Sequence, residues 1–189
     1  DDPMSDLPML SNARPVRIGV ISDTHIPQRW KALPTTVFGL FQGVDLILHA
    51  GDVGELWVLD QLGQIAPVVA VHGNDETDAA RAALPFLQTL TFGGTRIVLT
   101  HGHLPDFEAE MAMRATDDWA AKFDQLAKAG APHGAHILVS GHTHIPTWTQ
   151  YAGIWMLNPG AIASGSYFYR QSIQTVAVLT LCAGQAPAV

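Results

Sequence analysis

The feature that most constrains the fold of this chain is a series of short apolar runs, each of which ends in polar turn residues. The runs are rich in Val, Ile and Leu and are bounded by Gly, Asp or Asn. Continuous apolar runs of this length are typical of strands that are buried on both faces of a sheet. We therefore predict strands over residues 16–22, 45–49, 67–72, 96–100 and 136–140.

Segments with helical periodicity lie between several of these strands. They cover residues 35–42, 55–65, 106–114 and 116–129. Alternation of strand and helix predicts βαβ units and a sheet that is covered on both faces.

The C-terminal third has a different pattern. Residues 147–152, 153–157 and 172–181 follow one another with short turns and without an intervening helix. Residues 86–92 and 96–100, joined through Gly93-Gly94, predict a hairpin. We expect a mixed α/β sandwich, with parallel units first and antiparallel strands later.

The chain carries no composition break, charge block or fixed repeat, so we predict one domain over residues 15–185. Residues 1–14 are acidic and contain Pro, and they lack the basic start and apolar middle of a signal peptide. We expect them to be a disordered lead or a remnant of cloning. Apolar stretches do not reach the roughly 18–20 residues that span a bilayer. A cytoplasmic protein without membrane contact is the expectation.

The charge balance limits the classes of partner. A net charge of −7 argues against non-specific nucleic-acid binding, which needs a basic face. A small phosphorylated substrate stays compatible with this balance, because bound divalent cations would reverse the local sign. The single cysteine, Cys182, excludes an internal disulfide and a cysteine-based zinc site.

The turns that end the predicted strands are rich in metal-binding side chains. Seven of the nine histidines lie in or beside these turns. Since ligand sites in open α/β sheets form at the carboxyl ends of strands, we expect these turns to meet in one crevice. The candidate metal ligands are Asp23, His25, Asp52, Asn74, His101, His142 and His144.

This donor set indicates the kind of metal centre. Imidazole, carboxylate and carboxamide donors suit Mn²⁺, Fe or Zn²⁺, with Ni²⁺ and Mg²⁺ as further alternatives. Seven ligands are too many for one tetrahedral ion. They fit two ions that lie about 3.5–4 Å apart and share one carboxylate. Gly51, Gly73 and Gly141 each precede a candidate ligand, where a missing Cβ allows a sharp turn and close approach to an ion. We expect two divalent ions, with Mn²⁺ as the leading choice.

The order of these motifs resembles the calcineurin-like metallophosphoesterase superfamily, and the short length resembles its small bacterial and archaeal phosphodiesterase branch. The motifs are Asp23-x-His25, Gly51-Asp52, Gly73-Asn74, His101 and Gly141-His142-x-His144, with Asn158-Pro159-Gly160 as a later turn. The resemblance implies two β-sheets packed together and flanked by helices. It also implies one ion held by Asp23, His25 and His144, a second held by Asn74, His101 and His142, and Asp52 as the bridge.

The sequence departs from the family pattern after Asn74. Many members carry a histidine there that assists the leaving group, and this chain has Asp75. We predict His103 as the leaving-group acid, because it lies two residues after a candidate ligand. The alternative role of His103 is to orient a ligand or the substrate. Asp75 is a second candidate acid, and its alternative role is to cap the next helix or fix the Asn74 turn.

The leading functional prediction is a metal-dependent phosphodiesterase. A phosphomonoesterase or nucleotidase is the alternative within the same chemistry, and a catalytically silent scaffold for protein interaction is the alternative from another class. Small relatives often self-associate, so a homo-oligomer is a further expectation. The segment Tyr167-Phe168-Tyr169-Arg170 has two interpretations, a wall of the substrate crevice or structural packing.

Overall fold

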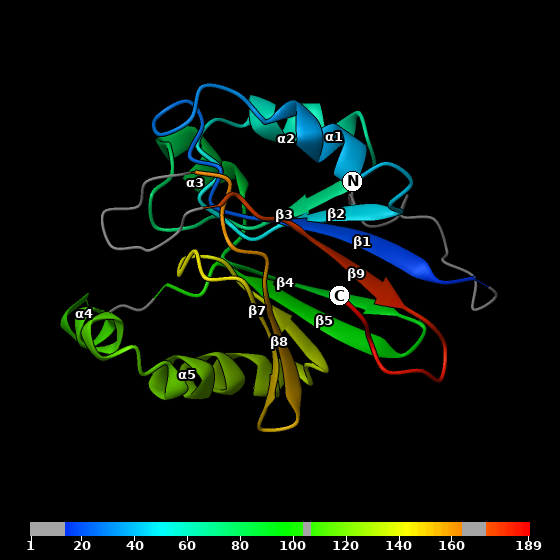
Figure 1. Cartoon of the computed structure of the whole chain (residues 1–189), viewed down its shortest axis with the longest axis vertical. Coiled ribbons are helices and arrows are strands. Elements are labelled where there is room, and N and C mark those ends of the chain that lie inside the picture. Colours follow the sequence, from blue (N-terminus) through cyan, green and yellow to red (C-terminus); the bar gives the residue numbers. More distant parts are fainter. Residues whose placement is uncertain (1–13, 104–106, 164–172) are drawn as a thin grey trace.

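The computed structural model describes residues 14–103, 107–163 and 173–189 (Figure 1). The helices are α1 (Thr35–Leu40), α2 (Trp57–Gly63), α3 (Asp78–Ala83), α4 (Phe107–Thr116) and α5 (Ala120–Gly130), followed by the short 3₁₀ helix η1 (Ala131–His133). The strands are β1 (Val16–Ile21), β2 (Leu46–His49), β3 (Val68–Ala70), β4 (Leu87–Phe92), β5 (Thr95–Thr100), β6 (Ile137–Val139), β7 (Thr147–Tyr151), β8 (Ile154–Asn158) and β9 (Ala177–Leu181).

The described strands form two mixed sheets. The first has the order β3-β2-β1-β9, in which β1, β2 and β3 are parallel and β9 is antiparallel to β1. The second has the order β4-β5-β6-β8-β7, with parallel pairing through β5, β6 and β8 and antiparallel pairing at both edges. The α/β sandwich with two mixed sheets is confirmed.

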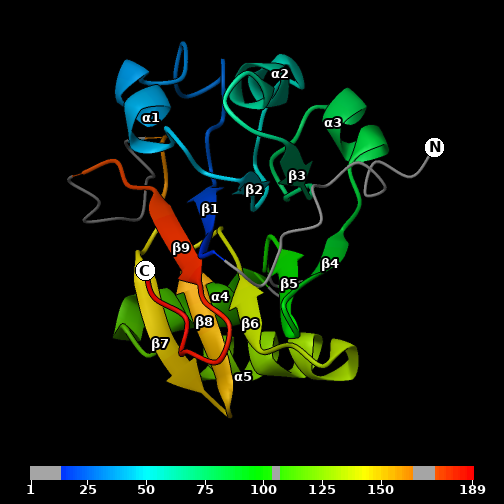
Figure 2. The same cartoon turned by 90° about the vertical axis from the view of Figure 1, so that its right-hand side faces the viewer.

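The sheets and helices are arranged in layers. Figures 1 and 2 show α1, α2 and α3 on the outer side of the first sheet, and α4 and α5 on the opposite side of the molecule, beside the second sheet. One apolar cluster lies between the sheets and includes Ile18, Leu48, Leu99 and Val139. Separate clusters pack each sheet against its helices. Both faces of the central strands are therefore buried, which explains why their sequences are apolar without alternation.

The predicted hairpin is present. Strands β4 and β5 pair from Leu87↔Thr100 to Phe92↔Thr95, and the turn between them consists of Gly93 and Gly94. Both glycines have positive φ, at 54° and 87°. This conformation matches the right-handed twist of the paired strands and is open to glycine without steric strain.

Three elements differ most from the sequence-based expectation: α3, β9, and β3, which covers only Val68–Ala70 of the predicted 67–72. Helix α3 was not predicted, because its six residues carry a single buried side chain, Ala80, and so show no apolar period. Strand β9 is shorter than the predicted 172–181, since its pairing with β1 ends at Ala177↔Val20. Beyond Val20, β1 pairs only with β2, through Ile21↔His49, before the first ligand turn begins. Among the described residues, no helix combines the length and apolar character that crossing a membrane requires.

Candidate metal centre

The turns that follow the central strands of both sheets meet at one edge of the sandwich. The turn after β1 bonds to the turn after β2, because the amide of Asp23 donates to Gly51 O at 3.0 Å and the amide of His25 donates to Asp52 O at 3.0 Å. The turns after β5 and β6 are joined in the same way, by the amide of Gly141 and His101 O at 3.1 Å. Since the amide of His142, after β6, also donates to Asp23 Oδ2 at 3.0 Å, the turns of the two sheets meet, and the predicted convergence of strand ends is present.

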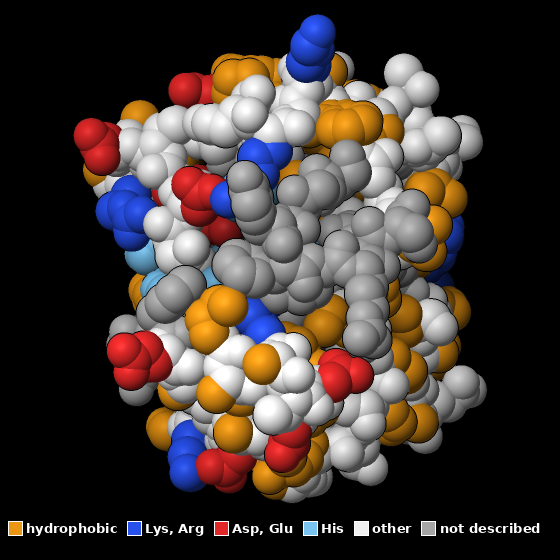
Figure 3. Space-filling view, turned by 60° about the vertical axis from the view of Figure 1, so that its left-hand side comes forward, with side chains coloured by type: hydrophobic (Ala, Val, Ile, Leu, Met, Phe, Trp, Pro, Cys, Tyr) orange, Lys and Arg blue, Asp and Glu red, His pale blue; other side chains and the backbone are white. Residues whose placement is uncertain are grey.

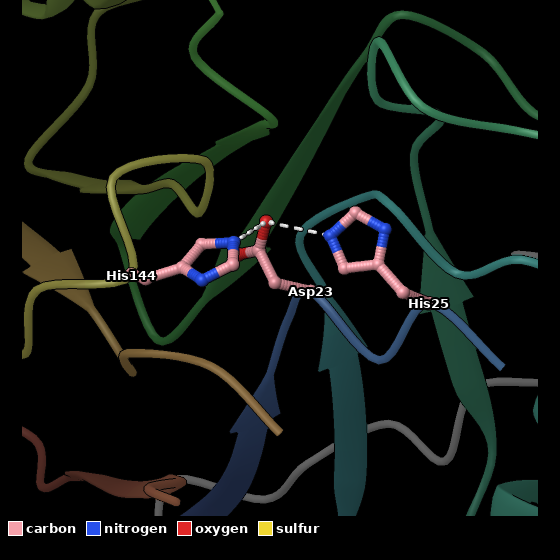
Figure 4. Close-up of side chains that lie close together, drawn as sticks. All are labelled: Asp23, His25 and His144. Carbon is pink, nitrogen blue, oxygen red and sulfur yellow. Dashed lines mark ion pairs between the residues drawn. The ribbon is translucent and has the colours of Figure 1, made fainter. Parts of the chain in front are cut away.

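A first group of candidate ligands consists of Asp23, His25 and His144, whose donor atoms all lie within 4.8 Å of one another. The carboxylate of Asp23 lies between the two rings (Figure 4). Its Oδ1 is 3.2 Å from His144 Nε2 and 3.9 Å from His25 Nε2. All three side chains are buried, with exposures of 5% or less.

The buried atoms of this first group fit a cation. Within the described residues, Asp23 Oδ1 and His25 Nε2 have no hydrogen-bond partner, although both are buried. Buried polar atoms without a partner are rare, and an ion-binding role is one of the standard explanations. The other oxygen of Asp23 accepts bonds from Ser22 Oγ at 2.6 Å and from the amide of His142 at 3.0 Å. These bonds fix the carboxylate so that Oδ1 faces the histidines.

The charge state of Asp23 also suits a ligand. Burial acts to raise its pKa, but the neighbouring His144 and His101 together lower it to about 2. The carboxylate is therefore ionised at neutral pH even before a cation arrives.

A second group consists of Asp52, His101 and His142, with Asn74 beside it. His101 Nε2 is 3.3 Å from Asp52 Oδ2 and 3.1 Å from Asn74 Oδ1. His101 Nδ1 lies 2.7 Å from Ala50 O, and because a carbonyl can only accept, this nitrogen carries the proton. The main chain just after β2 thus fixes the ring so that Nε2 faces the carboxylate and the amide oxygen.

Asp52 connects the two groups. Its Oδ2 lies 3.5 Å from His25 Nε2, in the first group, and 3.3 Å from His101 Nε2, in the second. Its Oδ1 accepts a hydrogen bond from the amide of Asp75 at 2.8 Å. Burial acts to raise the pKa of Asp52, but His101 and His25 hold it well below its usual range. An ionised carboxylate between two groups of ligands is the arrangement that a bridging ligand requires.

Several candidate ligands have a strained backbone. Asp23, His25, Asp52, His142 and His144 all have positive φ, between 46° and 67°. Residues other than glycine rarely adopt this left-handed region, which disfavours each of them by roughly 1–2 kcal/mol. Glycine would relieve the strain but has no side chain to bind an ion. Such strain typically occurs at functional sites.

Two of the glycines that precede candidate ligands lie against carboxylates of the two groups. A Cβ at Gly73 would lie 2.0 Å from Asp52 Oδ1, and a Cβ at Gly141 would lie 2.7 Å from Asp23 Oδ2. Any other residue at these two positions would displace a carboxylate of the centre.

Asp75 contacts the first group. Its Oδ2 lies 3.3 Å from His25 Nδ1 and 2.6 Å from an Arg29 nitrogen. The suggestion that Asp75 caps the next helix is wrong, because Thr77 Oγ1 accepts the bond from the amide of Ala80 at 3.2 Å. Asp75 helps to fix the Asn74 turn through its own amide, which donates to Asp52.

His103 lies beside the second group, as its spacing predicted. Its ring centroid is 5.6 Å from that of His101 and 6.2 Å from that of His142, and Phe86 packs edge-on against it at 5.5 Å. Burial, together with the charges of His101 and His142, lowers the pKa of His103 to about 4. Its Nδ1 has no hydrogen-bond partner within the described chain.

Sequence reasoning missed Glu110, which contacts a candidate ligand. Both carboxylate oxygens of Glu110, on α4, lie close to His142 Nε2, at 2.6 and 2.7 Å. Arg114, one turn later on α4, donates to the same carboxylate through Nε at 2.9 Å. Burial acts to raise the pKa of Glu110, but His142 and Arg114 lower it to about 2.

Two further supporting residues were missed. Glu76 accepts bonds from the amides of Val53, Gly54 and Gly73, each at 3.0 Å, and so connects the turns after β2 and β3. Lys122, buried on α5, donates from Nζ to Gly102 O, in the turn between His101 and His103. For Glu76 the sequence signal was an acidic residue next to Asp75, and for Lys122 it was a lysine on the apolar face of a helix.

The remaining histidines near the strand ends differ in their surroundings. His49 is fully buried, and its Nε2 lies 3.0 Å from Thr24 Oγ1. Burial lowers the pKa of His49 to about 3, so the ring is neutral.

On the face drawn in Figure 3, histidine side chains reach the surface beside acidic and basic ones. The segment from Tyr167 to Arg170 lies outside the described residues.

The chain belongs to the calcineurin-like phosphoesterase superfamily, whose domain profile matches residues 16–184. A probable metallophosphoesterase from Methanothermobacter thermautotrophicus is 38% identical over 144 residues, which are 76% of each chain. Phosphodiesterase YfcE from Escherichia coli K12 is 30% identical over 112 residues, covering 56% of this chain and 50% of that protein.

Solved structures share the fold. Vacuolar protein sorting 29 from Cryptosporidium parvum superposes with a TM-score of 0.72 at 22% identity, covering 89% of this chain and 86% of that chain. A phosphoesterase of Streptococcus pneumoniae, itself described as predicted, gives a TM-score of 0.60 at 25% identity, covering 89% of this chain and 84% of that one.

Proposed function

We propose that this protein is a phosphodiesterase that depends on two divalent metal ions. The observation that carries the proposal is the position of Asp52, whose Oδ2 lies within 3.5 Å of a histidine from each of the two ligand groups. Two ions sharing one carboxylate is the arrangement of two-metal hydrolases. The donor set supports Mn²⁺ as the ion, with Fe, Zn²⁺, Ni²⁺ and Mg²⁺ as alternatives.

Bound divalent ions would supply activation of a water molecule near neutral pH and neutralisation of phosphoryl oxygens. The chain supplies the geometry. Asp23, His25 and His144 would hold one ion, and Asn74, His101 and His142 would hold the other. Their fixed positions favour in-line attack on phosphorus, without a covalent intermediate on the enzyme.

His103 is the proposed contributor to leaving-group departure. It lies beside His101 and His142, and its pKa of about 4 makes the neutral ring the main form at pH 7. A neutral imidazole can donate its N–H to the leaving oxygen, which is weaker assistance than transfer from a cation. Asp75 is a less suitable acid, because Arg29 and His25 contact its carboxylate.

The preference for a diester rests on the relatives. One similar protein is named a phosphodiesterase, and the sequence departs from the family pattern at Asp75 in the way the small phosphodiesterase branch often does. A small phosphorylated compound in the cytoplasm is the proposed substrate. A homo-oligomer is a further proposal.

The alternative from another class is a scaffold for protein interaction. The likeness to vacuolar protein sorting 29 concerns the fold alone. All seven predicted ligand positions are filled in this chain, and the buried, unpartnered atoms of the first group favour ion binding. These observations support catalysis.

The test is a paired assay on metal-stripped protein. Samples reloaded with Mn²⁺, Mg²⁺, Ni²⁺ or Zn²⁺ are offered an aryl phosphodiester and the corresponding monoester. Asp52→Asn should abolish turnover and leave the circular dichroism spectrum unchanged. Asp60→Asn is the matched control, because Asp60 is an exposed acid on α2, and it should retain full activity.

Each outcome decides between the alternatives. Hydrolysis of the diester with at least one metal, lost in Asp52→Asn, supports the proposal. A preference for the monoester would assign a phosphatase instead. Lack of hydrolysis by the wild-type protein with every metal would favour the scaffold. Full activity of Asp52→Asn would contradict the role of Asp52 as a bridge.

A further inference from the structure

Helix α4 brings a buried carboxylate to one candidate ligand. Glu110 is 6% exposed, and its two oxygens lie 2.6 and 2.7 Å from His142 Nε2. The two residues are 32 positions apart in the sequence, so the contact is a product of the fold. Arg114 donates to Oε1 of the same carboxylate.

The contact fixes the proton on His142. An ionised carboxylate can only accept hydrogen bonds, so His142 Nε2 must be the donor. The other ring nitrogen, Nδ1, then carries the lone pair and is the one atom of this ring that can bind an ion. In the opposite tautomer Nδ1 would carry the proton and the lone pair of Nε2 would face the Glu110 carboxylate, so neither nitrogen could bind a cation while this contact persists.

Two other roles for Glu110 fit the geometry less well. As a direct ligand it would have to leave His142 and Arg114, although it already makes close contacts with both. As a proton donor it would have to be protonated, whereas its two partners are both donors and favour the ionised form.

We propose that Glu110 is a positioning residue, which sets the tautomer and orientation of His142 so that Nδ1 faces the second ion. The proposal rests on the proposed metal centre and adds a residue outside the seven ligands to it. A carboxylate that accepts from a metal-binding histidine also raises the basicity of the ring. The ion held by Asp52, Asn74, His101 and His142 therefore depends on α4 remaining in place, and the other ion does not.

The test measures ion binding and does not depend on turnover. Metal-stripped protein is titrated with Mn²⁺ in a calorimeter, and the two binding events are fitted separately. Glu110→Gln keeps the size of the side chain but removes its charge and lets an amide face the ring. We expect one ion to bind about 10–100-fold more weakly and the other to be unchanged. Glu108→Gln is the matched control, since Glu108 is an exposed acid on the same helix.

A second pair of variants assigns the weakened ion. In a His144→Ala background, which impairs the first group, Glu110→Gln should still weaken the remaining ion. In a His142→Ala background, Glu110→Gln should have no further effect. Equal effects in both backgrounds would show that Glu110 acts through general stability, and would overturn the proposal.

The tautomer itself is measured without metal. In long-range ¹H–¹⁵N spectra of the metal-free protein, His142 should carry its proton on Nε2, and Glu110→Gln should shift the ring toward a mixture of tautomers. Glu110→Asp should restore part of the wild-type signal. Wild-type spectra with the proton on Nδ1, or Glu110→Gln spectra and affinities equal to wild type, would overturn the proposal. Failure of the proposed function would instead appear in the wild-type protein, as absent turnover.

Discussion

His25 Nδ1 and Asp75 Oδ2 lie 3.3 Å apart, so the carboxylate that stands where many family members have a histidine contacts a candidate ligand. Arg29 holds the same oxygen of Asp75 at 2.6 Å. This pair fixes the His25 ring so that Nε2 faces Asp23 and Asp52. Carboxylates that orient metal-binding histidines in this way typically contribute 10–100-fold to affinity.

Asp75→Asn should therefore weaken the ion of the first group. We expect about tenfold lower affinity, the low end of that range, because half of the Asp75 side chain is exposed to solvent. Calorimetric titration with Mn²⁺ measures the effect, with Asp60→Asn as the control. Two binding events with wild-type affinities would show that His25 needs no support from Asp75.

Ion binding should release a proton from His101. Burial acts to lower the pKa of His101, but the charges of Asp52 and Asp23 and the bond to Asp52 raise it to about 9. At pH 7 the metal-free ring is therefore charged, and Nε2 must lose its proton before it can bind an ion. Affinity should rise up to tenfold per pH unit between pH 7 and 9 and then level off.

The proton is counted by titration calorimetry in buffers that differ in ionisation enthalpy. The dependence of the observed heat on the buffer should correspond to about one proton released for each ion that binds to the second group at pH 7. Heats that are equal in all buffers, with an affinity independent of pH, would show that His101 is already neutral in the metal-free protein.

Gly73→Ala should disable the centre. The new Cβ would lie 2.0 Å from Asp52 Oδ1 and 2.7 Å from the backbone nitrogen of Asp52, so the carboxylate must move. A displacement of about 1 Å at a catalytic group costs on the order of 100-fold in rate. The control is Gly63→Ala, at the end of α2, where a Cβ meets no atom within 4 Å.

The two glycine variants should also differ in stability. Gly63→Ala should stabilise the fold by roughly 0.5–1 kcal/mol, because alanine loses less freedom in a helix. Gly73→Ala should destabilise it by about 1–3 kcal/mol through overpacking. Denaturant unfolding and diesterase rates measure both. Wild-type turnover in Gly73→Ala would mean that Asp52 tolerates displacement.

His103→Ala should slow the reaction according to the leaving group. A hydrogen bond from the neutral ring should contribute less than the roughly 10²–10⁴-fold of full proton transfer when the leaving alkoxide is poor, and almost nothing when it is a nitrophenolate. Rates with alkyl and nitrophenyl diesters give the ratio, and His133→Ala, at an exposed histidine of η1, is the control. An equal rate with the poor leaving group would remove His103 from this role.

Lys122 should make stability depend on pH in the alkaline range. Burial lowers its pKa from 10.5 to about 8, so between these values the unfolded chain binds a proton that the folded chain does not. Stability therefore rises with pH across this window, and the rise should be absent in Lys122→Met. Denaturant unfolding from pH 7 to 10.5 measures it, with the exposed Lys128→Met as the control. A rise of the same size in both variants would assign it to other groups.

The sequence predicted the fold and the ligand turns because both are local patterns. An apolar run that ends in Asp-x-His or Gly-Asp specifies a buried strand and a polar turn within ten residues. Helix α3 was missed because it has almost no apolar face, and β9 was drawn too long because its end depends on where its pairing with β1 stops.

The residues that orient the candidate ligands could not be predicted, because their contacts join positions that are far apart in the sequence. Glu110 reaches His142 across 32 positions, and Arg29 reaches Asp75 across 46. Such contacts depend on how helices and turns are packed. The left-handed backbone at Asp23, Asp52 and His144 also contradicts local preference, as is expected where function overrides it.

Each ligand group takes side chains from the turns of both sheets. Asp23 and His25 follow β1 in the first sheet, and their partner His144 follows β6 in the second. Neither half of the sandwich alone can hold an ion in the proposed way. During synthesis from the N-terminus, both groups remain incomplete until residues 142 and 144 have emerged and the sheets have met. In the proposed centre, a complete ligand group for either ion therefore exists only late in folding.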